Sequence, residues 1–143
     1  MILVVAHPFD ELDASSAYDV WRLRQDVFVV EQGCPYPDLD GRDPEPGTVH
    51  VLLHEDEALI GYARVLDDGS EWRIGRVVLA RAGRGQGLAD ELMRSAMRSC
   101  PDRDVVLDAQ VPLAAWYSSH GFVADGPEFL EDGIPHLPMR RQG

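Results

Sequence analysis

The stretch I-G-R-V-V-L-A-R-A-G-R-G-Q-G-L-A-D-E-L-M-R-S-A-M, residues 74–97, decides the fold of this chain. It predicts an apolar strand, a turn with glycines at 83, 85 and 87, and an amphipathic helix over about 87–99. A glycine-rich turn that leads into a helix directs several backbone N–H groups at the positive helix end, which favours anion binding. On glycine spacing alone, a plain tight turn is an equal interpretation.

The segments around this stretch predict the rest of the sheet. Apolar runs at 49–53, 59–66 and 72–80, joined by short polar turns, predict an antiparallel meander. The apolar segment 105–109 follows the helix, and a strand reached through a crossover helix is typical of a parallel pair. The fold class is therefore α/β (α+β by some schemes), a mixed, mainly antiparallel sheet in a single domain over 1–143. The remaining expected elements are an edge strand at 2–6, helices at 15–31 and 113–119, and a closing hairpin of 122–124 with 134–139, linked by F-L-E-D-G.

The helix at 15–31 carries apolar residues at mostly three- and four-residue spacing, which predicts one buried face. Arg22 and Arg24, beside Asp19 and Asp26, are interpreted as its solvated face. The loop 33–47 that follows is long and rich in proline and glycine, and such loops are usually functional or disordered.

The charge balance limits the partners of the chain. The formal net charge is −12, and nucleic acids and anionic membranes need a basic face, so neither is expected as a partner. All 13 basic residues are arginines, which excludes a Walker A lysine and lysine nucleophiles. No apolar run reaches about 18 residues, and the N-terminus lacks a signal-peptide pattern, so we expect a cytoplasmic protein.

Metal and disulfide chemistry have weak support in the sequence. The segment D-L-D-G-R-D at 38–43 suggests a calcium loop, but its glycine comes too early and Val49 stands where the bidentate glutamate belongs. We therefore expect no metal. Cys34 and Cys100 lack a pairing pattern and are expected to be reduced, and the loop position of Cys34 leaves room for an exposed reactive thiol.

A family resemblance rests on two landmarks. R-G-Q-G-L-A at 84–89, after the strand V-V-L, resembles the acetyl-CoA-binding motif Q/R-x-x-G-x-G/A of the GNAT N-acetyltransferase superfamily. A-A-W-Y-S-S-H-G-F at 114–122 resembles its later Y-x-x-x-G-F junction. Segments that look like the ElaA-like branch extend from about residue 21 to 139 and include D-L-D-G-x-D at 38–43, D-A-Q at 108–110 and L-E-D-G-I-P-H-L-P-M at 130–139.

The resemblance implies a donor site for acetyl-CoA between splayed central strands. The pantetheine arm would pair with the backbone of Val77, Val78 and Leu79, with an N–H near Leu79 polarising the thioester carbonyl. Gln110 would bond the pantetheine where many relatives carry asparagine. The pyrophosphate would lie on the amides of the glycine turn, contributed by Arg84, Gly85, Gln86, Gly87, Leu88 and Ala89. Arg76 and Arg81 would contact phosphates or pair with local acids.

Acyl transfer to an amine also needs proton transfer. Tyr117 matches the position that often protonates the sulfur of coenzyme A, and a packing role is the alternative. Glu31, at the end of the first helix, and His136, in G-I-P-H, are candidate general bases. His50 is a further candidate that is more simply structural, and water is an alternative to all three. His7, His54 and His120 are interpreted as surface residues.

The sequence leaves the activity and the acceptor open. The favoured function is an N-acetyltransferase acting on a small-molecule or peptide amine, and the acidic charge favours a cationic acceptor. A GNAT-fold acyl-CoA-binding or regulatory module without turnover is the alternative, and an acyl-homoserine lactone synthase is a third. A homodimer is compatible with all three.

Overall fold

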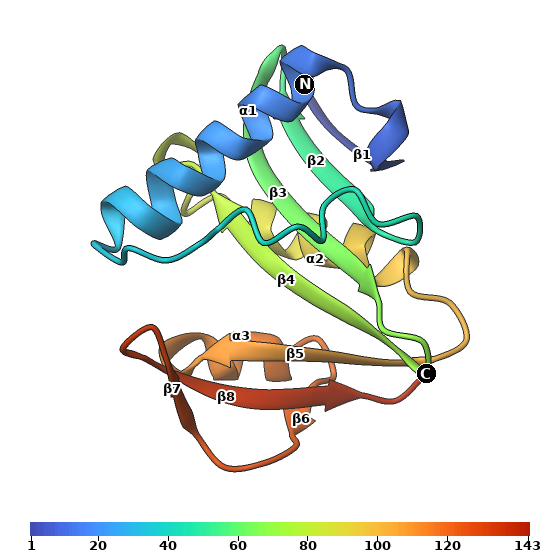
Figure 1. Ribbon diagram of the computed structural model, residues 1–143, viewed down its shortest axis with the longest axis vertical. Helices are drawn as coiled ribbons and strands as arrows, with labels where there is room; N and C mark the ends of the chain where they lie inside the picture. The colour runs from blue at the N-terminus through green and yellow to red at the C-terminus, as the bar shows by residue number, and fades with distance from the viewer.

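The computed structural model describes all 143 residues as one eight-stranded sheet of order β1-β2-β3-β4-β5-β8-β6, with β7 paired to β8 (Figure 1). Three α-helices, one π-helical segment and three short 3₁₀ turns complete the fold. The strands are β1 (Ile2–Pro8), β2 (Val49–Glu55), β3 (Ala58–Asp67), β4 (Glu71–Leu79), β5 (Asp104–Gln110), β6 (Val123–Ala124), β7 (Phe129–Glu131) and β8 (Ile134–Arg141). The helices are α1 (Ala14–Arg24), α2 (Leu88–Arg98) and α3 (Ala114–Ser118).

The sheet confirms the predicted fold class. Strands β1 to β4 are antiparallel neighbours, β4 and β5 form the one parallel pair, and β8 returns antiparallel to β5. The crossover between β4 and β5 runs through the glycine turn and α2, as the stretch 74–97 predicts.

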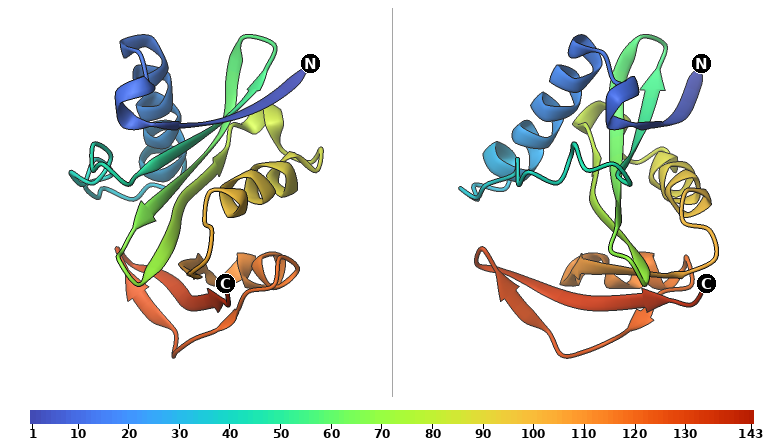
Figure 2. Two further views of the ribbon diagram at one scale, coloured as in Figure 1. Left: turned by 90° about the vertical axis from the view of Figure 1, so that its right-hand side faces the viewer. Right: turned by 45° about the vertical axis from the view of Figure 1, so that its right-hand side comes forward.

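Helices cover both faces of the sheet (Figure 2). The larger apolar core lies between the sheet and α2, where Leu92, Met93 and Ala96 are fully buried. A smaller core lies on the opposite face, where Val20 and Leu23 of α1 pack against strands β2 to β4. None of the helices has the length and apolar character needed to cross a bilayer.

The first helix differs from its prediction in two ways. α1 ends at Arg24 and continues as a π-helical segment, Gln25–Glu31, with bonds such as Gln32 N–H to Val27 O. The wider winding leaves Val30 66% exposed, so the apolar face does not extend to the end of the helix. The assignment of Arg24 to a solvated face is wrong, because its side chain is completely buried.

The closing hairpin also differs from its prediction. β6 does pair with β8, but the linking residues Phe129–Glu131 form a strand of their own, β7. Asp132 and Gly133 turn β7 into β8, with φ of 51° and 77°. An Asp-Gly pair with both φ positive is typical of a two-residue hairpin turn, and this dipeptide was the signal available in the sequence.

Candidate active site

The central parallel pair is joined at one end only. Hydrogen-bonded register between β4 and β5 runs from Glu71 opposite Asp104 to Arg73 opposite Val106. Beyond that point the strands diverge, as Figure 1 shows. A bulge between β3 and β4 lies at the same level, and Arg76 adopts φ of 53° there. The divergence opens a cleft of about 730 Å³ that is lined from both strands, from the end of the first helix and from the β7–β8 turn.

The glycine turn adjoins this cleft through Arg84, which lines it. Gly85 and Gly87 both have φ of 75°, and no heavy atom lies within 4 Å of the position that a Cβ would take at either glycine. The N–H groups of residues 85–87 make no backbone hydrogen bond, and α2 begins at Leu88 without a side-chain cap. The Arg84 N–H, by contrast, bonds to Arg81 O at 3.2 Å. The free amides at a helix start therefore fit an anionic group, and they begin at Gly85.

The backbone of Leu79 faces the opening between the strands. Ala80 donates its N–H to Ile60 O on β3 at 2.8 Å. Because hydrogen-bond direction alternates along an antiparallel strand, the N–H and C=O of Leu79 point away from β3 and toward β5. By the same alternation, the backbone groups of Val78, which stands opposite Tyr62, face β3. Leu79 can thus pair with an extended ligand in the cleft.

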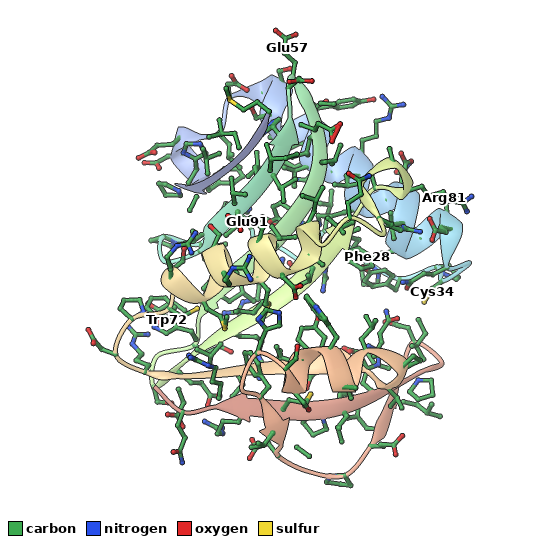
Figure 3. The ribbon with its side chains drawn as sticks, turned by 180° about the vertical axis from the view of Figure 1, so that it is seen from behind. Phe28, Cys34, Glu57, Trp72, Arg81 and Glu91 are labelled. Carbon is green, nitrogen blue, oxygen red and sulfur yellow. The ribbon has the colours of Figure 1, made fainter.

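Glu31 is held by the two arginines of the turn. Its carboxylate accepts bonds from Arg84 Nη1 at 2.8 Å, Arg84 Nη2 at 3.1 Å and Arg81 Nε at 3.2 Å. The bonds from Arg84, then those from Arg81, lower the pKa of Glu31. Arg84 Nε in turn bonds to Leu79 O at 3.1 Å. Figure 3 shows Arg81 on the same side of the molecule as Phe28, near the end of the first helix, and Cys34, in the loop that follows.

Tyr117 contributes a phenol to the cleft from α3. The residue is only 7% exposed, its hydroxyl has no hydrogen-bond partner in the protein, and it lines the cleft. Its ring packs edge-on against Trp116 and Phe122, with centroid distances of 4.8 and 6.3 Å. Burial raises the pKa of Tyr117 to about 12, so the phenol is protonated at neutral pH.

Gln110 and His136 stand opposite each other on β5 and β8, and both line the cleft. Gln110 Nε2 donates to Gln32 Oε1 at 3.3 Å, which spans from β5 to the end of the first helix. His136 Nδ1 lies 2.7 Å from Ile134 O. Because a carbonyl only accepts, Nδ1 carries a hydrogen and the neutral ring leaves a lone pair on Nε2. Stacking on Phe129, with centroids 5.7 Å apart, fixes the ring.

The loop 33–47 forms one wall of the cleft, and arginines from α1, β3 and β4 hold it in place. Arg24 Nε and Nη1 donate to Asp38 at 2.9 Å and Asp43 at 2.7 Å. Arg64 donates to Asp40 at 2.8 Å, and Arg76 donates to Asp38 at 2.9 Å. The acids of the D-L-D-G-R-D segment therefore bind arginines, and this arrangement explains a pattern that resembled a calcium loop.

Two side chains, those of Cys34 and His120, lie elsewhere than the sequence suggested, and His50 is buried as its structural interpretation predicts. Cys34 is 7% exposed, not an exposed thiol, and its Sγ lies 3.5 Å from Asp132 O across the cleft. His50 is buried between Tyr62 and the Asp43 carbonyl, and burial lowers its pKa, so its role is structural. The His120 side chain is only 9% exposed, and the assignment of this residue to the surface is wrong.

Comparison with known proteins agrees with this geometry. The family model described as an acetyltransferase (GNAT) domain matches residues 30–142. A UPF0039 protein of Mycobacterium tuberculosis is 46% identical over 93% of this chain and 88% of its own length. The crystal structure of an acyl-CoA N-acyltransferase from Pseudomonas aeruginosa superposes with a TM-score of 0.93 at 40% identity, over 99% of both chains. That of Escherichia coli ElaA gives 0.94 at 39% identity, over 99% of this chain and 100% of ElaA.

The divided parallel pair and the superposition on an acyl-CoA N-acyltransferase define the class of the protein. It has an acyltransferase fold of the kind that uses acyl-CoA donors. More narrowly, the chain belongs to the GNAT acetyltransferase family, and its ElaA and UPF0039 homologues confirm the resemblance to the ElaA-like branch.

Proposed function

We propose that this protein is an N-acetyltransferase that transfers an acetyl group from acetyl-CoA to an amine by direct attack. The observation that carries the proposal is that Arg84, which directly precedes the free amides of the glycine turn, and Tyr117, whose hydroxyl is unpartnered, line the same cleft. The amides from Gly85 to Ala89, with Arg84, would hold the pyrophosphate, and Leu79 and Gln110 would pair with the pantetheine. Acetyl-CoA supplies the activated acetyl group.

Tyr117 is the proposed general acid. As the acceptor nitrogen forms its bond to the carbonyl carbon and the carbon–sulfur bond breaks, the phenol donates its proton to the leaving sulfur. The phenol, with its pKa raised to about 12 by burial, is protonated at neutral pH and therefore has the proton to donate. The acceptor amine must lose one proton before it attacks, and its nitrogen loses a second proton after the attack. One of these restores the tyrosine and one leaves to solvent.

His136 is the proposed base, in preference to Glu31. Its Nε2 lone pair is free while Nδ1–H stays on Ile134 O, so the ring can accept the proton of an approaching ammonium. Glu31 has a lowered pKa and bonds to two arginines, and both features make a carboxylate a weaker base. We assign Glu31 to the donor end of the cleft, where it orients Arg84.

The charges around the cleft favour a cationic acceptor. The five arginines that line it, at 42, 64, 73, 76 and 84, are each ion-paired with a carboxylate. Among the lining carboxylates, Glu131 and Asp132 of the β7–β8 turn have no cationic partner, so the charge left unpaired in the cleft is negative. These two groups would attract an amine, and a second ammonium on the same acceptor could remain on them after the first has reacted.

The test is release of coenzyme A from acetyl-CoA with a panel of butylamine, 1,4-diaminobutane, spermidine, glucosamine and a lysine peptide. We expect turnover with at least one amine. Tyr117→Phe should lower kcat by about 10²-fold or more, with acetyl-CoA affinity unchanged within twofold. The matched control is Tyr18→Phe, because Tyr18 is 63% exposed on α1. Binding of acetyl-CoA without release on any amine would instead identify a non-catalytic module.

The acceptor class has its own test. Glu131→Gln combined with Asp132→Asn should raise KM for 1,4-diaminobutane several-fold and leave KM for butylamine nearly unchanged. Glu128→Gln is the matched control, because it removes a charge before β7 from a side chain that does not line the cleft. Equal effects on both amines would contradict the proposed role of the two carboxylates and leave the acetyltransferase proposal intact.

A further inference from the structure

A single carboxylate connects the helix that begins at the glycine turn with the helix that carries Tyr117. Asp90 lies in the first turn of α2. Its Oδ1 accepts a bond from Trp116 Nε1–H at 2.9 Å and lies 2.8 Å from His120 Nε2. Both hydrogen bonds lower the pKa of Asp90, and the bond with His120 has the larger effect. The two ring nitrogens thus meet at one oxygen atom.

The two partners of Asp90 lie on either side of Tyr117 in the sequence. α3 has only five residues, and a helix that short cannot hold its own geometry without tertiary contacts. Trp116 packs edge-on against Tyr117 at 4.8 Å and against His120 at 5.1 Å. A carboxylate that anchors the indole and the imidazole therefore fixes the rotation of α3 about its axis, and with it the direction of the phenol.

The location of Asp90 is otherwise unfavourable for a donor site. A carboxylate in the first turn of α2 stabilises the helix through the helix dipole. The same negative charge, however, lies near the amides that fit an anionic group, and it would weaken anion binding there. Glu91, the next residue, bonds to Arg94 at 2.9 Å on the exposed surface and makes no contact with α3. Figure 3 labels Glu91 on α2.

We propose that Asp90 is a positioning residue that couples the start of α2 to α3 and sets the place of the Tyr117 hydroxyl relative to the glycine turn. The inference rests on the proposed function, since it takes Tyr117 as the acid and the turn as the pyrophosphate site. Pantetheine has a limited reach when extended, so the spacing of the two helices decides how well the sulfur meets the phenol. A displacement near 1 Å at a reacting group can lower a rate by about 10²-fold.

Two substitutions separate the tether from the charge. Asp90→Asn keeps an accepting oxygen at the position of Oδ1 and removes the charge, so kcat should stay within about threefold of the unmodified protein. Asp90→Ala removes the oxygen, and kcat should fall by about tenfold to hundredfold. KM for acetyl-CoA should remain level or fall in both variants, because a negative charge has left the anion site. Glu91→Gln, the matched control, should change kcat by less than twofold.

A double-mutant cycle shows whether Asp90 acts through Tyr117. In a Tyr117→Phe background, Asp90→Ala should lower the residual kcat by less than about threefold, because the group that it positions is gone. The assay uses the best amine of the panel, with far-UV circular dichroism to confirm the fold of each variant. An NMR readout independent of turnover is the indole N–H signal of Trp116, which should shift in Asp90→Ala and stay close to its position in Asp90→Asn.

Three outcomes would overturn the inference. Equal losses of kcat from Asp90→Ala in both backgrounds would show that Asp90 does not act through Tyr117. Equal losses in the Asn and Ala variants would assign the effect to charge and not to the tether. An unchanged kcat in Asp90→Ala would remove the role altogether. Failure of the proposed function gives a different result, since no amine would then release coenzyme A from the unmodified protein, and failure of the acid role alone would leave turnover unchanged in Tyr117→Phe.

Discussion

Arg24→Met tests whether buried ion pairs hold the loop 33–47, which forms one wall of the cleft. The guanidinium of Arg24 is completely buried and donates to the Asp38 carboxylate, the Asp43 carboxylate and the Asp38 carbonyl. Removal of one partner from a buried pair costs about 3–5 kcal/mol, because the remaining charge keeps its desolvation penalty. Methionine retains most of the apolar stem of the side chain, so the loss is mainly electrostatic.

The neighbouring arginines set the expected size of the effect. Asp38 keeps Arg76 at 2.9 Å and Asp43 keeps Arg64 at 3.3 Å, so neither carboxylate is left without a cation. We therefore expect the lower end of the range, about 3 kcal/mol. For a chain of 143 residues, an unfolding entropy of about 2.1 cal/mol/K per residue sums to about 0.3 kcal/mol/K, so Tm should fall by about 10 °C.

Urea unfolding followed by tryptophan fluorescence measures the loss as a change in midpoint at constant m value. Arg22→Met is the matched control on the same helix, because its side chain is 69% exposed and lies 3.8 Å from Asp26. The control should change stability by less than about 0.5 kcal/mol. A loss below about 1 kcal/mol in Arg24→Met, or one equal to the control, would refute the view that Arg24 holds the loop.

Two further predictions concern the glycine turn and acid stability. Gly87→Val should lower coenzyme A affinity by tenfold or more in calorimetry. At φ of 75° a β-branched residue is strained by about 1–2 kcal/mol, and its side chain would cover the free amides. Gly69→Val is the control, because Gly69 has φ of 83° in a turn outside the cleft, so this variant should lose stability but not affinity. Although burial alone would raise the pKa of Asp40 and Asp43, bonds from Arg64 and Arg24 outweigh it and lower both. The unfolded chain therefore binds more protons than the folded chain in acid. The stability that these two ion-paired carboxylates contribute is present above the unfolded pKa of about 3.9 and is lost as pH falls below it. Arg24→Met removes the bond to Asp43, so an equally steep loss of stability with falling pH in this variant and in the unmodified protein would contradict this.

The fold could be predicted from the sequence because local patterns and global topology agree. The meander, the crossover helix and the apolar strand after it each have a distinct pattern, and together they fix the parallel pair. The glycine turn was visible for the same reason, since the glycines mark a tight turn and Gly85 and Gly87 adopt positive φ there. Such features depend on residues that are close together in the chain, so the sequence pattern predicts them directly.

The side chains that organise the site depend on distant partners. Arg24 lies four residues after Val20 and three before Val27, so its spacing placed it on the buried face, but adjacent aspartates favoured a solvated interpretation. Only the fold reveals that Asp38 and Asp43 return to meet it. His120 is similar, because its partner Asp90 is 30 residues away. Ion pairs between residues far apart in the chain produce no periodic pattern in the sequence, so such a pattern could not predict them.

The interrupted ladder between β4 and β5 has a consequence for solubility. A continuous sheet has two edges, but this one has four, and unpaired strand edges invite pairing with other chains and aggregation. The outer edges are blunted, since β1 ends at Pro8 and β6 and β7 have only two and three residues. The inner edge of β4 lies between α1 on one face and α2 on the other. A foreign strand would bring side chains to both faces, where those helices already lie, so the sheet can remain divided without becoming a template for fibrils.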